Sequence, residues 1–197
     1  MKLVVATNNP HKIKEIASIL RGQNYEILSL KDFPGSPVVV EDKRTFEENA
    51  VKKASIIAKH TGLLALADDS GLEVDALNGE PGVKSARFAG ENATDEDRNR
   101  KLLNLLKDVP ESKRSARFKC AMALSTPQGD TKVVLGVCEG NIAFEPKGNT
   151  GFGYDPIFFV PCYGKTFAEL GPEIKNQISH RAIALEKIKE LLSNLYC

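Results

Sequence analysis

The chain has 197 residues, 42% of them hydrophobic, which is enough for one substantial domain or for two small lobes that share a core. Its 27 basic and 26 acidic residues leave a formal net charge of +1, which argues against the broad basic field that non-specific nucleic-acid binding requires. We therefore expect no nucleic-acid partner, and any phosphate binding must be local.

The N-terminal segment turns polar too early for a signal peptide, and no apolar run approaches the roughly 20 residues that span a bilayer. The cysteines Cys120, Cys138, Cys162 and Cys197 form no CxxC pair and lack the spacing to histidine of a zinc site. We expect a soluble cytoplasmic protein with no membrane-spanning segment, in which these cysteines are free thiols.

The chain opens with a predicted strand–turn–helix unit. Residues 2–6 are largely apolar, as in a buried strand, and Ile13, Ile16 and Leu20 then recur at helical spacing.

The turn of this unit, Thr7-Asn8-Asn9-Pro10-His11-Lys12, has features of an anion site. Asn9 is a good N-cap and Pro10 suits the first helical position. Free backbone N–H groups and the helix dipole would then face outward together with Thr7 and Lys12, where a phosphate could bind. An ordinary capped helix with a solvated lysine is the alternative interpretation.

A second helix is predicted over 45–60, because Thr45 and Glu48 have the capping-box relationship and a glycine follows at position 62. On this helix Asn49 and Lys53 lie four residues apart and so share a face, from which Lys53 could contact an anion. The neighbouring lysines make a solvated lysine face the alternative.

A buried strand is predicted at 63–67, which places Asp68 and Asp69 at its carboxyl end. Together with Glu41 they offer the hard oxygen ligands that Mg²⁺ takes when it bridges to phosphate. Adjacent carboxylates repel, so one of them should be bound to metal or raised in pKa, and either state suits activation of a water. The alternative is a solvated acidic turn capped by Ser70.

The second half of the chain mixes extended and helical segments. An extended segment at 72–77 is followed by a capped helix over 94–109, a predicted hairpin formed by 116–125 and 131–144, and a last helix over about 180–195. This order predicts an α/β fold with a partly antiparallel sheet.

The loop Gly151-Phe152-Gly153-Tyr154-Asp155-Pro156 combines glycines, which permit close backbone approach, with two aromatic residues. An aromatic face beside polar backbone is a natural platform for a purine. A tight turn whose Phe152 and Tyr154 pack inward is equally compatible with this sequence.

Lys175 and the run Ser179-His180-Arg181 gather cations and an imidazole at the start of the last helix. No acid stands nearby in the sequence to neutralise Arg181, so the group could bind a triphosphate or the edge of a base. A surface-exposed pair is the alternative.

Taken in order, TNNPHK, the block from Glu41 to Ala50, LADDSGLEVDAL, PGVKSARFAG, GFGYDPIFF and ISHR resemble the inosine triphosphate pyrophosphatase family. The resemblance covers essentially the whole chain, and ADDSGL, GFGYDPIF and SHR are jointly very specific in this order and spacing. It implies a single α/β domain over 1–197 with an elongated mixed central sheet, flanking helices and two lobes around a substrate cleft, usually assembled as a homodimer.

The resemblance also implies Mg²⁺-dependent hydrolysis of ITP, dITP or XTP at the α–β phosphoanhydride, which yields the monophosphate and pyrophosphate. By similarity Glu41 and Asp69 serve the metal, Asp69 is the base for the attacking water, and Asp68 assists. Phe152 would stack on the purine, and His180 and Arg181 would read its six-position oxygen. The implied substrate-binding residues are Thr7, Asn8, Asn9, Pro10, His11, Lys12, Lys53, Ser70, Phe152, Gly153, Tyr154, Asp155, Lys175, His180 and Arg181.

Two other functions compete with this interpretation. A pyrophosphatase of similar fold could act on other nucleotides, but the GFGYDP and SHR motifs favour the non-canonical purine substrates. A nucleotide-binding regulator that has lost catalysis would be expected to lack Glu41 or Asp69, and both are present.

Overall fold

The computed structural model describes residues 2–22 and 25–194. Its strands form a seven-stranded sheet in the order β2-β1-β3-β4-β5-β6-β7. β1 (Lys2–Val5) pairs in parallel with β2 (Glu26–Ser29) and β3 (Leu64–Val74), whereas β6 (Phe158–Val160) pairs antiparallel with β5 (Thr131–Ile142) and β7 (Lys165–Thr166). β4 (Ser115–Ser125) lies between β3 and β5. The predicted α/β class with a partly antiparallel sheet is confirmed.

The chain divides into two compact units. Unit 1 contains the described residues of Met1–Asp69, Cys120–Gly136 and His180–Cys197, and unit 2 contains Ser70–Lys119 and Val137–Ser179. Each unit has its own cluster of buried apolar side chains, and no residue belongs to both clusters.

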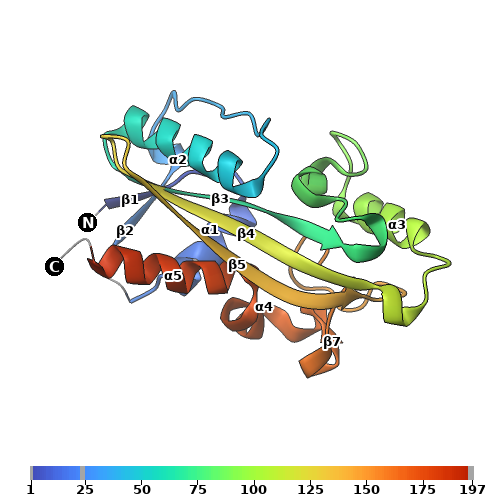
Figure 1. Ribbon diagram of the computed structural model, residues 1–197. Coiled ribbons are helices and arrows are strands. Elements are labelled where there is room, and N and C mark those ends of the chain that lie inside the picture. The colour runs from blue at the N-terminus through green and yellow to red at the C-terminus, as the bar shows by residue number, and fades with distance from the viewer. Residues whose placement is uncertain (1, 23–24, 195–197) are drawn as a thin grey trace. The chain divides into compact units, whose positions relative to one another are not determined.

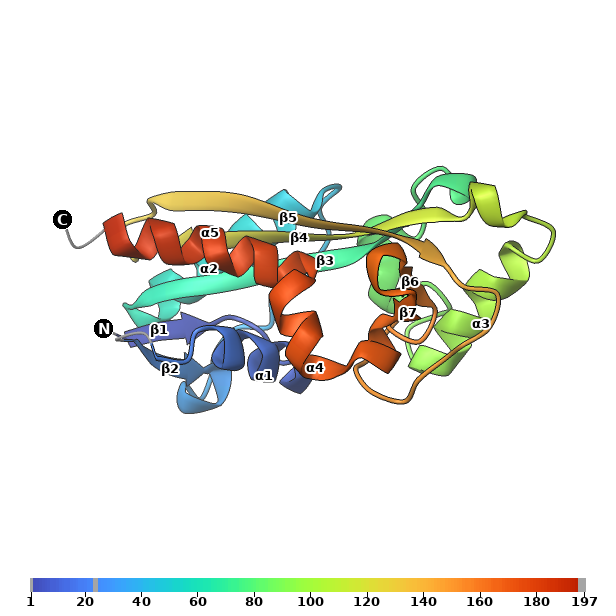
Figure 2. The ribbon, with the colours of Figure 1, turned by 90° about the horizontal axis from the view of Figure 1, so that it is seen from below.

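In unit 1, helices cover both faces of the strands. Figures 1 and 2 show α2 (Phe46–Thr61) on one face, and α1 (Pro10–Ile19) and α5 (His180–Asn194) on the other. Leu3 and Leu66 join Ile16 of α1 and Ile188 of α5 in one buried cluster. Because side chains alternate along a strand, the intervening residues of β1 and β3 face α2. The strands thereby offer a different face to each group of helices.

The helix starts in unit 1 follow from local capping. Asn9 caps α1 with its side chain, and Thr45 and Glu48 form the predicted capping box of α2. α2 ends where Gly62 adopts a left-handed conformation. These predictions are confirmed.

Unit 2 is built around aromatic side chains. Helix α3 (Asp95–Leu105) begins at the predicted capping box of Thr94 and Asp97. Helix α4 (Phe167–Ile178) contributes Phe167, whose ring centroid lies 5.1 Å from that of Phe158. The sequence patterns did not predict β2, β6, β7 or α4, and α4 is interrupted by a kink at Gly171, before Pro172.

The structure corrects the predicted strand boundaries. β3 continues to Val74 without a break, so Asp68 and Asp69 lie inside a strand and not at its carboxyl end. The strand continues because Leu72 and Val74 are fully buried in the core of unit 2. The predicted extended segment at 72–77 therefore becomes the end of β3 followed by a 3₁₀ turn. In addition, α3 ends at Leu105, before the predicted residue 109.

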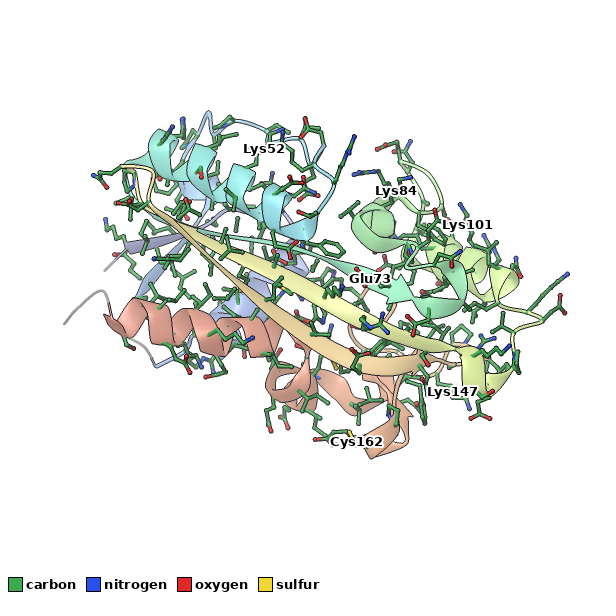
Figure 3. The ribbon with its side chains drawn as sticks, in the orientation of Figure 1. Lys52, Glu73, Lys84, Lys101, Lys147 and Cys162 are labelled. Carbon is green, nitrogen blue, oxygen red and sulfur yellow. The ribbon has the colours of Figure 1, made fainter. Side chains whose placement is uncertain are left out.

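Cys120 and Cys138 are buried free thiols and Cys162, labelled in Figure 3, is an exposed one, while Cys197 lies outside the described residues. Within the part of the chain that the structure describes, no helix combines the length and the apolar character needed to cross a bilayer.

Candidate active site

Strand alternation separates the two adjacent carboxylates of β3. Asp68 Oδ2 lies 3.0 Å from Nζ of Lys12 in α1, on one face of the sheet. Asp69 Oδ2 accepts a 2.9 Å hydrogen bond from Nδ2 of Asn49 in α2, on the other face. Asp68 and Asp69 are therefore not an acidic turn, and each has its own set of partners.

Asp68 is a buried anion surrounded by cations. Its Oδ2 accepts a 3.0 Å hydrogen bond from Nη2 of Arg181, in addition to its contact with Lys12. Burial opposes ionisation, but the charges of Lys12, Arg181 and Lys53 hold the pKa of Asp68 well below its ordinary value. Asp68 therefore stays ionised but is too weak a base to take a proton from water.

Arg181 lies at the start of α5 with only 1% of its surface exposed. It pairs with Asp68 of β3 and with Glu15 of α1. The expectation that Arg181 has no acid near it is wrong, because these partners are 113 and 166 residues away in sequence and only the fold brings them close. The guanidinium links a strand to two helices.

Asp69 is the carboxylate of unit 1 whose pKa is raised. It is 5% exposed, and burial, followed by the negative charge of Glu41, raises its pKa to about 6. The prediction that one of the two aspartates has a raised pKa is confirmed, but the causes are burial and Glu41 and not Asp68. A carboxylate with this pKa can accept a proton near neutral pH, as a general base must.

Helix α2 positions the groups around Asp69. Asn49 and Lys53 share its buried face, as their spacing predicted. Lys53 Nζ forms an ion pair with Glu41 and donates a 2.5 Å hydrogen bond to the backbone oxygen of Asp68. Asn49 Oδ1 accepts from the backbone N–H of Lys43 at 2.9 Å, which fixes the segment that carries Glu41. One helical turn thus holds both Asp69 and Glu41 in place.

The opening turn is only partly as expected. Asn9 Oδ1 accepts hydrogen bonds from the backbone N–H groups of His11 and Lys12, at 2.9 and 3.3 Å. These two N–H groups are therefore not free for an anion, because the N-cap side chain already occupies them. The phosphate interpretation of the turn now depends on Thr7, Asn8 and the side chain of Lys12.

A pocket of about 210 Å³ opens beside this turn. Its polar lining comes from Thr7, Asn8, Glu41 and Lys53, four of the predicted site residues. Its apolar lining is Ala6, Leu30, Pro37, Val38, Val39 and Ile57. The pocket therefore offers both signs of charge.

Glu41 and Asp69 fit a divalent cation by their chemistry. Each has carboxylate oxygens, and Glu41 is close enough to raise the pKa of Asp69, a repulsion that a cation would relieve. Asp68 fits less well, since Lys12 and Arg181 already neutralise it. Among the described residues no group of three or more His, Cys, Asp or Glu side chains is arranged to hold a metal. Two carboxylates are nevertheless sufficient for Mg²⁺, which keeps several waters and binds substrate phosphates.

In unit 2, the predicted aromatic loop is built around Asp155. Its Oδ2 accepts hydrogen bonds from the backbone N–H of Phe152 at 2.9 Å and from Nζ of Lys175 at 2.6 Å. Gly151 has φ +80°, and a Cβ there would lie 2.1 Å from Asp155 Oδ2. Only glycine fits this position, so the loop closes tightly on its own carboxylate.

The two aromatic residues of this loop differ in placement. Tyr154 is 4% exposed and its hydroxyl donates to the backbone oxygen of Ser85 at 2.9 Å, so it packs inward. Phe152 is half-buried, with Nζ of Lys175 located 4.5 Å from its ring centroid. Only Phe152 remains suited to stack on a base, and a base would use the face opposite Lys175.

Four predicted residues remain: Ser70 follows Asp69 in β3, His180 is buried at the start of α5, Pro10 is the first residue of α1, and Gly153 has φ +64° in the aromatic loop. Sequence reasoning missed Glu15, and although it placed Asn49 on the same helix face as Lys53, it did not predict that Asn49 contacts Asp69. Their only local signal is helical spacing, because Glu15 lies three residues after Lys12 and Asn49 four before Lys53.

Comparison with known proteins gives a consistent picture. The sequence matches the model of the Ham1 family over residues 3–191. It is 56% identical over 196 residues to the dITP/XTP pyrophosphatase of Desulforamulus reducens, which covers 100% of this chain and 98% of the relative. It is 49% identical over 189 residues to the dITP/XTP pyrophosphatase of Bacillus subtilis, with 96% of each chain covered.

Among solved structures, a HAM1 protein from Coxiella burnetii aligns with a TM-score of 0.90 and 46% identity, covering 98% of this chain and 99% of that one. The Ham1 protein of Staphylococcus aureus aligns with a TM-score of 0.88 and 44% identity, with 98% and 99% of the two chains covered. The expected mixed sheet with flanking helices is thereby confirmed.

Proposed function

The chain belongs to the Ham1 family, and we propose that it hydrolyses non-canonical purine nucleoside triphosphates such as dITP, ITP and XTP to the monophosphate and pyrophosphate, with Mg²⁺ as cofactor. Relatives named dITP/XTP pyrophosphatase span essentially the full length of the chain. The observation that carries the proposal is Asp69, a buried carboxylate with its pKa raised to about 6 beside Glu41 and Lys53.

Asp69 is the proposed general base. At neutral pH it is mostly ionised, and it can take a proton from the water that attacks the α-phosphate. Asn49 donates to Asp69 Oδ2 and so fixes the orientation of the carboxylate. Asp68 cannot replace Asp69 in this role, because its neighbouring cations lower its pKa and so make it a much weaker base.

Glu41 and Asp69 are the proposed ligands of Mg²⁺, which when bound would polarise the phosphate oxygens and offset their charge. Lys53 is the proposed partner of the leaving pyrophosphate, together with Lys12. Burial lowers the pKa of Lys53, but Asp68, Glu41 and Asp69 raise it further, so Lys53 remains a cation. Fixed cations of this kind stabilise the charge that develops as the phosphoanhydride breaks.

Base recognition is assigned to Phe152 and to the start of α5. Phe152 would stack on the purine, with Lys175 behind its ring and Asp155 holding the loop. Hypoxanthine and xanthine carry a carbonyl where adenine carries an amino group, so a donor from His180 or Arg181 would reject adenine. Arg181 is a buried guanidinium with several N–H donors, held by Asp68 and Glu15 at the start of α5.

The test is pyrophosphate release, measured separately from phosphate release, from ITP, XTP, dITP, ATP and GTP, with Mg²⁺ and with chelator. We expect metal-dependent pyrophosphate from ITP, XTP and dITP and little from ATP or GTP. Turnover of other nucleotides alone would identify a pyrophosphatase of different specificity. Binding without turnover would identify a catalytically silent nucleotide-binding protein.

We also propose that the chain acts as a single cytoplasmic domain over 1–197 and assembles as a homodimer, in keeping with the family resemblance. Light scattering coupled to size-exclusion chromatography measures the assembly directly, and a mass of 21.5 kDa at micromolar concentration would contradict the dimer.

A further inference from the structure

In unit 2, both polar groups of Gly153 are held by side chains of α3. The backbone N–H of Gly153 donates to Asp95 Oδ2 at 2.6 Å, and its backbone oxygen accepts from Asn99 Nδ2 at 3.1 Å. Asp95 and Asn99 lie four residues apart and therefore share one face of the helix. This face of α3 therefore binds both backbone polar groups of a single residue of the aromatic loop.

Gly153 lies at the centre of the aromatic loop, where the backbone turns. It adopts φ +64°, lies between Phe152 and Tyr154, and makes no other polar contact among those described. The N–H of Phe152 is held by Asp155 and the hydroxyl of Tyr154 by Ser85, so the two flanking residues have separate anchors. The contacts with α3 therefore hold the loop at its centre, directly after Phe152, and add to the separate anchors of the two flanking residues.

Asp95 also connects the aromatic loop to the segment that precedes α3. Its Oδ1 pairs with Arg98, whose Nη1 donates to the backbone oxygens of Ala86 and Ala93. Lys101, labelled in Figure 3, donates from the same helix to the backbone oxygen of Phe88 at 2.6 Å. One carboxylate thus joins two loops, including the PGVKSARFAG motif that the proposed chemistry leaves without a role.

Asn99 is a buried polar residue whose presence has a cost in stability. It is 5% exposed, and its Oδ1 has no hydrogen-bond partner among the described residues. A buried polar atom without a partner destabilises a protein, whereas an apolar side chain at this position would avoid that cost. The presence of an amide at this position is explained by its other polar atom, Nδ2, which donates a hydrogen bond to the backbone oxygen of Gly153.

We propose that Asp95 and Asn99 are positioning residues that fix the Phe152 ring for the base of the substrate, an inference that rests on the proposed function. Neither side chain is assigned a contact with substrate. Their effect should appear in the affinity for the nucleotide, while the chemical step, which is assigned to Asp69, should continue at its normal rate.

The kinetic test compares Asn99→Ala and Asp95→Ala with Asp95→Asn. For dITP we expect KM to rise roughly tenfold in the two alanine variants, with kcat changed by less than about twofold. Asp95→Asn keeps an oxygen that can accept from Gly153 and should restore most of the affinity. Arg100→Ala is the matched control, because Arg100 forms an exposed ion pair with Asp97 on the same helix. An unchanged KM in both alanine variants, or a fall in kcat alone, would overturn the proposal.

A second readout does not depend on hydrolysis. The chain contains no tryptophan, so Phe152→Trp introduces a single tryptophan at the proposed platform, which can be excited selectively over the tyrosines. In that background Asn99→Ala and Asp95→Ala should lower the fluorescence anisotropy of the nucleotide-free protein, and Arg100→Ala should not. If dITP is not a substrate but the anisotropy falls, the positioning role stands and the proposed function fails. If dITP is hydrolysed and the anisotropy is unchanged, the positioning role fails.

Discussion

In unit 1 the buried carboxylate of Asp68 is held by the charged side chains of Lys12 and Arg181. In unit 2 the centre of the aromatic loop is held through the backbone of Gly153 by Asp95 and Asn99. Removing one charge from the first arrangement leaves another charge buried and unpaired, which is costly. Removing one side chain from the second leaves a neutral backbone group, which costs less. Substitutions in unit 1 should therefore change chemistry, pH dependence and stability, and those in unit 2 should change affinity.

The largest effect is expected for Asp69→Asn. An amide cannot take a proton from water and is a poorer ligand for Mg²⁺, so kcat should fall by about 10³-fold while the protein stays folded. Steady-state pyrophosphate release measures the loss, and circular dichroism checks the fold. The control is Asp42→Asn, which removes an exposed carboxylate that pairs with Lys52, labelled in Figure 3. Near-normal turnover by Asp69→Asn would reject Asp69 as the base.

Arg181→Met should cause the largest loss of stability. The variant leaves Asp68 and Glu15 without their shared cation, and breaking a buried ion pair in this way costs about 3–5 kcal/mol. Urea unfolding monitored by circular dichroism measures the change. Adding Asp68→Asn to the variant should recover part of the loss, because the uncompensated charge is then gone. Unchanged stability of Arg181→Met would show that the remaining cations suffice for Asp68.

The pH dependence of stability offers a test of Asp69 in metal-free protein. The folded-state pKa, about 6, lies above the ordinary 3.8, so ionised Asp69 opposes folding by ~3 kcal/mol at neutral pH. This cost is absent below pH 4, grows between pH 4 and pH 6, and is complete above pH 6. Asp69→Asn should therefore be more stable than the wild type at pH 7 and equal to it near pH 4. Denaturant unfolding in chelator across this range measures the difference, and a constant difference would contradict the raised pKa.

Phe152→Ala should weaken substrate binding and leave the chemistry in place. Stacking of a base on an aromatic ring contributes about 1–3 kcal/mol, so KM should rise by roughly five- to 150-fold with little change in kcat. Tyr163→Ala is a suitable control, since Tyr163 is an exposed aromatic residue outside the loop. An unchanged KM would exclude Phe152 as the base platform.

The contrast between the units also explains what could be predicted from the sequence. Helix starts at Asn9, Thr45 and Thr94 were predicted because each cap acts within a few residues of the chain. The partners of Arg181 could not be predicted in this way, since Asp68 and Glu15 are brought to it only by the tertiary fold. The same holds for the contact of Asn99 with Gly153, which joins residues 54 positions apart.

Asp68 and Asp69 show how a wrong boundary misleads chemical reasoning. Ending the strand at residue 67 made the two aspartates members of one acidic turn, whereas in the continuous β3 they face opposite sides of the sheet. The strand continues because of core contacts at Leu72 and Val74, which lie beyond a polar stretch that resembles a turn. The prediction that one of the two aspartates has a raised pKa holds for Asp69, but the predicted cause, repulsion between the two carboxylates, is wrong.

The smallest effect is expected for Tyr154→Phe. The change removes one hydroxyl and leaves the backbone oxygen of Ser85 without its 2.9 Å hydrogen bond, which should lower stability by ~1 kcal/mol. KM should rise only a few-fold, because Asp155 and the α3 contacts still hold the loop. Thermal unfolding and the KM for dITP measure both quantities. A loss of affinity as large as that of Phe152→Ala would mean that the loop depends on this single hydrogen bond, and that its separate anchors do not act independently.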